Sequence, residues 1–257
     1  MKFEGKVVVV TGASRGIGKA ICESFASEGA TVVGVARSGL AETESAVKLA
    51  GGRFIANNAD LGAGTQGGCA GVINEILSKT GRIDALVNNA GTIRRAPAMD
   101  FSETDWNAVI AMNLNSPFFL MQAAAKWWIK FGKAGAPENA RLKIINIASL
   151  LSFQGGITVP AYAASKHAIA GVTKALSNEW AKERINVNAI APGYIATENT
   201  RALREDPARN KAILDRIPEG RWGNPSDIDG CCMFLASSGA DYLNGAVLNI
   251  DGGWLGR

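Results

Sequence analysis

Short apolar runs recur along the whole chain, and between them apolar residues fall at helical spacing. The runs expected to form strands are Val7–Val10, Thr31–Val35, Arg53–Ala56, Ala85–Val87, Lys143–Ile147, Ile185–Ile190 and Ala246–Ile250. A continuous β-branched run such as the first is typical of a strand buried on both faces of a parallel sheet. Strands that alternate with helices through short links predict an α/β protein with a doubly wound parallel sheet.

Two segments interrupt this alternation. Residues 131–139 contain Gly and Pro, and we expect a surface turn there after a long helix. Pro192–Pro218 is polar and longer than a plain connection, so we expect a substrate loop at about residues 192–218. No repeat, low-complexity tract or interdomain linker is evident in the 257 residues, which predicts a single domain covering 1–257.

The composition argues against several classes of function, among them nucleic-acid binding and metal binding. The 27 basic and 23 acidic residues give a formal charge of +4 without a basic stripe, so nucleic acid is not an expected partner. The four cysteines contain no Cys-x-x-Cys pattern, and the single histidine, His167, cannot supply a metal cluster, so we expect no disulfide and no metal. No secretory or membrane-spanning segment is evident, which predicts a cytoplasmic protein without membrane contact.

A glycine-rich turn follows the first strand directly. Thr11–Gly18 lies between a strand and a helix, where backbone N–H groups at the helix N-terminus can hold a pyrophosphate. Its glycines allow a tight turn and a close approach of the cofactor. The expected dinucleotide contacts in this turn are Gly12, Ser14, Arg15, Gly16, Ile17 and Gly18.

The end of the second strand should decide between the two nicotinamide cofactors. A carboxylate there would bind the ribose 2′-hydroxyl of NAD, but this chain has Ala36-Arg37-Ser38. Arg37 can pair with a 2′-phosphate, Ser38 can donate to it, and Arg15 adds a second guanidinium. We therefore favour NADP, with NAD as the alternative if both arginines are ordinary surface residues.

Polar residues also follow the third and fourth strands. Asp60 comes after the third strand together with Leu61, and its carboxylate can accept a hydrogen bond from an adenine amino group. Asn88 to Gly91 end the fourth strand, where amide side chains can brace the sheet. We expect Asn89, Ala90 and Gly91 to line the nicotinamide ribose, although such turns are common and either feature alone is weak.

Three residues further along the chain suggest proton transfer. Tyr162 and Lys166 are one helical turn apart, and Ser149 lies at the end of the fifth strand. Because a tyrosine with a pKa near ~10 is a poor base, we expect the Lys166 ammonium to lower the pKa of Tyr162 and make it a general acid/base. A lone Tyr-x-x-x-Lys pair is more often an exposed helix pair. With Ser149 and the glycine-rich turn, the set predicts hydride transfer between a nicotinamide and an alcohol or ketone.

With these motifs in order along essentially its whole length, the chain resembles the short-chain dehydrogenase/reductase family. The resemblance implies a Rossmann fold, a homotetramer, and catalytic roles for Asn113, Ser149, Tyr162 and Lys166, in which Asn113 organises a proton-relay water. It also implies that Tyr162 and Lys166 contact the cofactor, Lys166 through the nicotinamide ribose. The segment that contacts the nicotinamide carboxamide is matched by Pro192, Gly193, Ile195 and Thr197.

A narrower resemblance is to the 2-deoxy-D-gluconate 3-dehydrogenase group, which includes 2-dehydro-3-deoxy-D-gluconate 5-dehydrogenases. It rests on the segments 91–97, 151–156, 191–197, 216–223 and 251–255. The implied substrate is a small keto-deoxy sugar acid, held by Ser149 and Tyr162. Arg94 or its neighbour Arg95 could bind the carboxylate, with Arg94 our first choice, and Gln154 could bind a hydroxyl. The group is generally associated with NAD, so Ala36-Arg37-Ser38 departs from it.

Two other functions share much of this pattern. A 3-oxoacyl-thioester reductase would carry the same core motifs but has no clear need for Arg94 and Arg95. A non-catalytic dinucleotide-binding sensor on the same fold would be expected to have a broken Ser/Tyr/Lys set, and here the set is intact.

Overall fold

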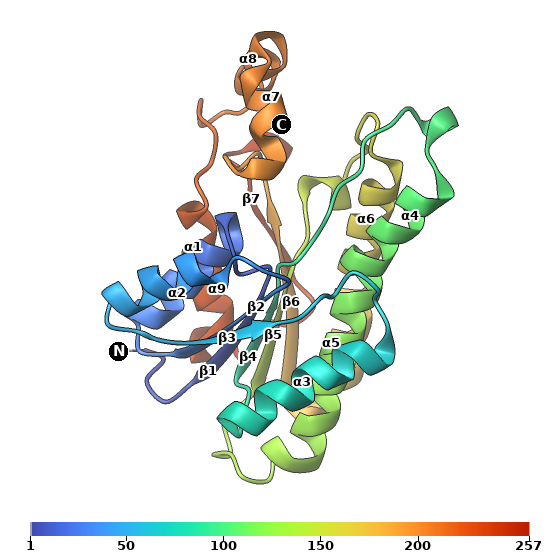
Figure 1. The fold of residues 1–257 in the computed structure, drawn as a ribbon. Helices are drawn as coiled ribbons and strands as arrows, with labels where there is room; N and C mark the ends of the chain where they lie inside the picture. The colour runs from blue at the N-terminus through green and yellow to red at the C-terminus, as the bar shows by residue number, and fades with distance from the viewer. Residues whose placement is uncertain (1, 257) are drawn as a thin grey trace.

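The computed structural model describes residues 2–256, which contain one seven-stranded sheet. Its strands are β1 (Val7–Thr11), β2 (Thr31–Ala36), β3 (Arg53–Asn58), β4 (Ala85–Asn88), β5 (Leu142–Ile147), β6 (Ile185–Pro192) and β7 (Val247–Ile250). All pairs are parallel, in the order β3-β2-β1-β4-β5-β6-β7 (Figure 1). The predicted doubly wound sheet is thus confirmed, and β3 and β6 extend two residues beyond the expected ends.

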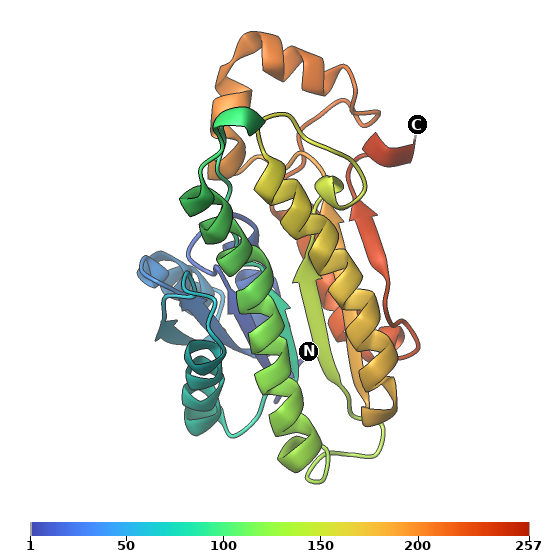
Figure 2. The same ribbon diagram turned by 90° about the vertical axis from the view of Figure 1, so that its right-hand side faces the viewer.

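Two hydrophobic cores lie on opposite faces of the sheet, because successive strand residues point to opposite sides. Val7 and Val9 of β1 enter one core, and Val8 and Val10 enter the other. The first core is covered by α3 (Gln66–Thr80), α5 (Ser116–Trp127) and α6 (Pro160–Trp180), the second by α1 (Gly16–Ser27), α2 (Leu40–Leu49) and α9 (Ser226–Ala236). Figures 1 and 2 show the two helical layers. Burial on both faces explains why the central strands are continuous apolar runs.

One long helix includes α4 (Glu103–Ile110) and α5 and continues to Gly132. Two π-helical segments lie in it, η2 (Ala111–Asn115) and η3 (Trp128–Gly132), so the turn expected from residue 131 begins only after Gly132. Among the described residues it is the one helix long and apolar enough to cross a membrane, by length and composition alone. It packs against α3 and α6, and core helices pass the same test.

The polar segment after β6, residues 192–218, is called the lid below. It folds into η6 (Glu198–Thr200), α7 (Arg201–Glu205) and α8 (Pro207–Leu214). In Figures 1 and 2 the lid (orange) stands above the carboxyl ends of the strands, and the C-terminal segment after β7 lies near it. A backbone hydrogen bond of 3.0 Å from Glu219 to Gly252 joins the residue after the lid to that segment.

Candidate active site

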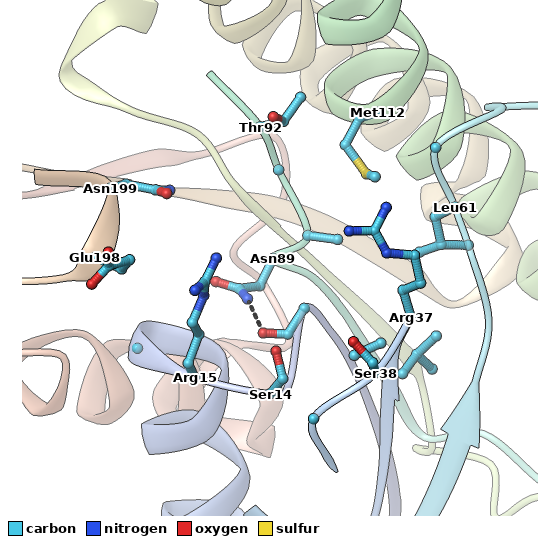
Figure 3. Close-up of a pocket in the computed structure, with 18 of the residues that line it drawn as sticks. Ser14, Arg15, Arg37, Ser38, Leu61, Asn89, Thr92, Met112, Glu198 and Asn199 are labelled. Carbon is cyan, nitrogen blue, oxygen red and sulfur yellow. Dashed lines mark hydrogen bonds between the residues drawn. The ribbon is translucent and has the colours of Figure 1, made fainter. Parts of the chain in front are cut away.

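A cavity of about 880 Å³ opens at the carboxyl ends of β1 and β4. The strand order reverses between these two strands, and such a switch point leaves a crevice in which ligands bind. Most of the expected cofactor residues line this one cavity, although they come from distant parts of the chain (Figure 3). They are Gly12, Ser14, Arg15, Gly16, Ile17, Arg37, Ser38, Asp60, Leu61, Asn89, Ala90, Gly91 and Thr197.

The glycine-rich turn forms one wall of the cavity, and two of its glycines exclude side chains. Gly12 has a φ of 66°, and a Cβ there would lie 2.8 Å from Nδ2 of Asn89. A Cβ on Gly18 would overlap the carbonyl oxygen of Gly12, so Gly18 packs α1 against the turn instead of lining the cavity. Since α1 begins at Gly16, its unpaired N–H groups lie at the cavity edge, where a pyrophosphate fits.

Thr11, which the sequence analysis left without a role, joins the turn to β4. Its buried hydroxyl oxygen accepts from the backbone N–H groups of Asn89 and Ala90, both at 3.0 Å. In return, Nδ2 of Asn89 donates to the carbonyl oxygens of Thr11 at 2.9 Å and Gly12 at 3.1 Å. These four bonds hold the two strand ends together under the cavity. The sequence did offer one indication of this role: Thr11 is a hydroxyl residue placed between an apolar strand and the glycines.

Two arginines lie in the cavity, one on each side of Asn89 in Figure 3. Arg37 and Ser38 follow β2, so the strand end presents a guanidinium and a hydroxyl, the groups that suit a 2′-phosphate. The carboxylate of Glu42, also in the cavity wall, forms a 2.6 Å salt bridge with a lysine of α1. Arg15 lies apart from Arg37, so it is poorly placed to bind the same phosphate.

Asp60 and Leu61 follow β3 at another wall of the cavity. Oδ1 of Asp60 accepts from the backbone N–H of Gly62 at 2.8 Å, which orients the carboxylate. Its second oxygen remains available to an adenine amino group. Leu61 is buried and packs in the core beneath.

Ser149, Tyr162 and Lys166 form one cluster where β5 ends beside the first turns of α6. Ser149 follows β5 closely, and its side chain hydrogen-bonds Tyr162. Nζ of Lys166 lies 5.5 Å from the centroid of the Tyr162 ring and donates to the carbonyl oxygen of Ile147 at 2.6 Å. Lys166 is therefore buried and anchored to the last residue of β5, next to the tyrosine.

The charge environment of Tyr162 differs from the expectation. Burial raises the pKa of Tyr162, while the hydrogen bond with Ser149 and the positive charge of Arg95 lower it in part. Burial also lowers the pKa of Lys166 to about 8. The expected lowering of the Tyr162 pKa is therefore not found, because burial outweighs the hydrogen bond with Ser149 and the charge of Arg95. Arg95 is a favourable charge that the sequence did not indicate.

Asn113 lies buried in the π-helical segment η2, at the centre of the long helix. Its Oδ1 accepts from the N–H of Thr92 at 2.8 Å, and its Nδ2 donates to the carbonyl of Thr92 at 2.9 Å and to Oγ of Ser165 at 3.1 Å. The amide thus ties the segment after β4 to α6, the helix that carries Tyr162 and Lys166. The expected role of Asn113 with a proton-relay water stays a prediction, and π-helical segments such as η2 are common at functional sites.

The two arginines after β4 point to different places. Arg94 forms a 3.2 Å salt bridge with Asp105 of α4 and lines the cofactor cavity. Arg95 donates to the carbonyl of Asn199 in the lid at 3.2 Å, and its charge acts on Tyr162. Arg94, our first choice for the substrate, therefore lies on the cofactor side, paired with a carboxylate, and Arg95 lies on the catalytic side.

The remaining expected residues surround the base of the lid. Pro192 ends β6, and Gly193 packs so tightly that a Cβ there would lie 2.6 Å from the Cα of Asp251. Ile195 is buried, and Thr197 lines the cofactor cavity. Of these four residues, only Thr197 lines the cavity. Pro192, Gly193 and Ile195 are not among the residues that line it. Gln154 contacts the C-terminal segment, where Nε1 of Trp254 donates to its Oε1 at 3.2 Å.

The family model for short chain dehydrogenases matches residues 6–208. A 2-dehydro-3-deoxy-D-gluconate 5-dehydrogenase of Escherichia coli is 51% identical over 255 residues, which are 99% of this chain and 97% of the relative. The chain belongs to the short-chain dehydrogenase family.

Solved structures of this family superpose over nearly the whole chain. A proposed 2-deoxy-D-gluconate 3-dehydrogenase from Agrobacterium tumefaciens, with bound NADP, is 50% identical with a TM-score of 0.86 and coverage of 99% and 98% of the two chains. A gluconate 5-dehydrogenase from Burkholderia cenocepacia, in complex with NADP and tartrate, is 35% identical with a TM-score of 0.90 and coverage of 100% and 97%. This short-chain dehydrogenase is an NAD(P)-dependent oxidoreductase with a Rossmann fold, as predicted.

Proposed function

We propose that this short-chain dehydrogenase interconverts a keto-deoxy sugar acid and the corresponding alcohol with NADP. Its first candidate substrates are 2-dehydro-3-deoxy-D-gluconate and 2-deoxy-D-gluconate. The observation that carries the proposal is an intact Ser149–Tyr162–Lys166 cluster with the Arg95 guanidinium acting on its tyrosine. The names of the E. coli relative and the A. tumefaciens structure support this substrate class.

The cluster supplies the proton chemistry of the reaction. When bound, the cofactor supplies or takes up a hydride at its nicotinamide ring. In reduction, the Tyr162 hydroxyl gives its proton to the substrate oxygen, and in oxidation the Tyr162 oxygen accepts that proton. Ser149 donates a hydrogen bond to the same oxygen and stabilises the charge that develops there. Arg95 stabilises the phenolate left on Tyr162, and Lys166 holds α6 to β5 beside it.

The preference for NADP rests on the end of β2. Arg37 and Ser38 lie in the cavity there, and a guanidinium and a hydroxyl match a phosphate better than a ribose hydroxyl. The NADP bound in the structures from A. tumefaciens and B. cenocepacia supports the same choice. Gly12 and Gly16 line the cavity without side chains, which leaves room beside the turn for the diphosphate.

The test is a nicotinamide absorbance assay with a panel of substrates. Keto-deoxy sugar acids, neutral ketones and 3-oxoacyl thioesters are each offered with NADPH and with NADH, and the alcohols with the oxidised forms. We expect the highest kcat/KM for a keto-deoxy sugar acid with the phosphorylated cofactor. Faster turnover of a 3-oxoacyl thioester would replace this proposal with a reductase of acyl thioesters.

We further propose a cytoplasmic homotetramer whose only substrates are small molecules. Large apolar side chains remain exposed on the two helical layers, among them Ile129 and Phe131 at the end of the long helix and Phe234 on α9. Self-association would bury them. Sedimentation equilibrium of the purified protein tests the oligomeric state, and a monomer at assay concentration would contradict it.

A further inference from the structure

A tryptophan close to the C-terminus lies between the lid and the catalytic strand. Trp254 is 4% exposed and packs with Leu150, Ile213 and Ile217. Leu150 directly follows Ser149 in the chain, so the indole packs against the residue next to this serine. Tyr194 of the lid packs on the same indole, with 4.7 Å between ring centroids.

Trp254 determines which groups Gln154 can offer to a ligand. The indole N–H can only donate, and it donates to Oε1 of Gln154 at 3.2 Å. The amide oxygen is therefore turned toward the indole, and the amide N–H groups face the other way. Gln154 lies between Ser149 and Tyr162 in the chain, so these donors belong to the loop that joins the two catalytic residues.

Arg216 lies over the face of the same indole. Its guanidinium carbon is 4.0 Å from the ring centroid, a cation–π arrangement that fixes the plane of the group. Asp215, its neighbour in the chain, forms a salt bridge with Lys211 at 2.7 Å, and Glu219 forms one with Arg221 at 3.8 Å. Arg216 is solvent-exposed, so its N–H groups are accessible to a ligand. Its charge also acts on Tyr194.

The groups around Trp254 are therefore mostly donors. The guanidinium of Arg216, the two amide N–H groups of Gln154 and the hydroxyl of Tyr194 suit an anion that carries several oxygens. In a six-carbon acid that reacts at its fifth carbon, the carboxylate is four bonds away, about 5 Å in an extended chain. A carboxylate at that distance needs a cation other than Arg95, which acts at the reacting end.

We propose that Arg216, held over Trp254, binds the carboxylate of the sugar acid, and that Gln154 and Tyr194 bind its hydroxyls. The inference rests on the proposed function, because it assigns the acid end of that substrate. Arg216 would then be a specificity residue of the lid. Its guanidinium would select acids over neutral sugars of the same length, because of the two only the acid offers a carboxylate for a bidentate contact.

The test compares Arg216→Met with Arg216→Lys. Methionine keeps an apolar contact with the indole and removes the charge, whereas lysine keeps the charge but lacks the planar fork. For Arg216→Met we expect KM for the acid to rise roughly ten- to a hundred-fold, with kcat and the Kd of NADP nearly unchanged. For Arg216→Lys we expect a KM for the acid between the values of the wild type and of Arg216→Met. For the neutral amide of the same acid, wild type and Arg216→Met should have equal KM.

Arg209→Met is the matched control, because the charge of Arg209 also acts on Tyr194 from the lid. We expect its KM for the acid to stay near the wild-type value. An equal rise in KM for Arg209→Met, or an equal loss with acid and amide, would show that Arg216 only supports the lid and would overturn the inference.

A binding measurement separates the inference from the proposed function. Calorimetric titration of the NADP-loaded enzyme with D-gluconate reports the acid subsite without turnover. If wild type binds gluconate and Arg216→Met does not, the subsite stands even when no keto-deoxy sugar acid is reduced. If wild type reduces the acid and Arg216→Met behaves identically, only the subsite is refuted. If wild type neither turns over the acids nor binds gluconate, both are refuted.

Discussion

Replacing Thr11 by valine removes the hydroxyl that joins β1 to β4 and keeps the shape of the side chain. Thr11 is 2% exposed, and its oxygen accepts from the N–H groups of Asn89 and Ala90 at 3.0 Å each. The variant leaves both donors without this partner. Each unsatisfied buried donor costs about 1–3 kcal/mol. The Asn89 N–H keeps a 3.1 Å bond to the carbonyl of Val87, so the main loss falls on the Ala90 N–H. Because both residues are only half-buried, water can replace part of the loss, and we expect a decrease of about 1–3 kcal/mol in the free energy of unfolding.

The assay is urea unfolding of Thr11→Val and of Thr11→Ser, which retains the acceptor. A loss of this size lowers the midpoint of urea unfolding, and it lowers the melting temperature by roughly 2–12 °C in a protein of this length. Cofactor affinity should fall as well, since Asn89, Ala90 and Gly91 line the cavity and Asn89 keeps only its side-chain bonds to the turn. If Thr11→Val unfolds at the same urea concentration as wild type, the two hydrogen bonds do not hold the strand ends, and the reasoning is refuted.

Three further predictions concern the catalytic cluster and the cofactor. Tyr162→Phe should lower turnover by ~10²-fold or more with little change in the Kd of NADP; near-normal turnover would contradict its role as acid and base. Arg37→Asp should shift the ratio of kcat/KM from NADP toward NAD, because the new carboxylate repels a 2′-phosphate; a wild type that already prefers NAD would disprove this. Arg95 lowers the pKa of Tyr162, so Arg95→Met should move the acidic limb of the alcohol-oxidation pH profile to higher pH, since the phenolate then forms only at higher pH. Arg94→Met, which loses a charge already paired with Asp105, is the control and should leave that limb in place.

Much of the architecture follows from local sequence pattern. Continuous β-branched runs such as Val7–Val10 can be buried on both faces only in a sheet covered by helices on each side. A glycine-rich turn between such a strand and a helix has few uses other than holding a phosphate group. The spacing of Tyr162 and Lys166 places both side chains on one face of a helix whatever surrounds it. These features depend on neighbours within a few residues, so they can be read before the chain is folded.

Contacts between distant segments could not be read in this way. Arg94 and Arg95 are adjacent and chemically identical, and only the packing of α4 on one side and the lid on the other sends one to Asp105 and the other toward Tyr162. The pKa of Tyr162 likewise depends on burial and on Arg95, which is 67 residues away in the chain.

The sequence alone determined the fold class, the family, most of the residues that line the cofactor cavity and the members of the Ser149–Tyr162–Lys166 cluster, because each is encoded by residue types at short, regular spacing. Only the tertiary structure decided which cation faces which part of the site. Trp254 meets Gln154 and Arg216 because the C-terminal segment returns beneath the lid after β7. The strength and direction of a charge interaction depend on distance and burial in three dimensions, and neither is a property of position along the chain.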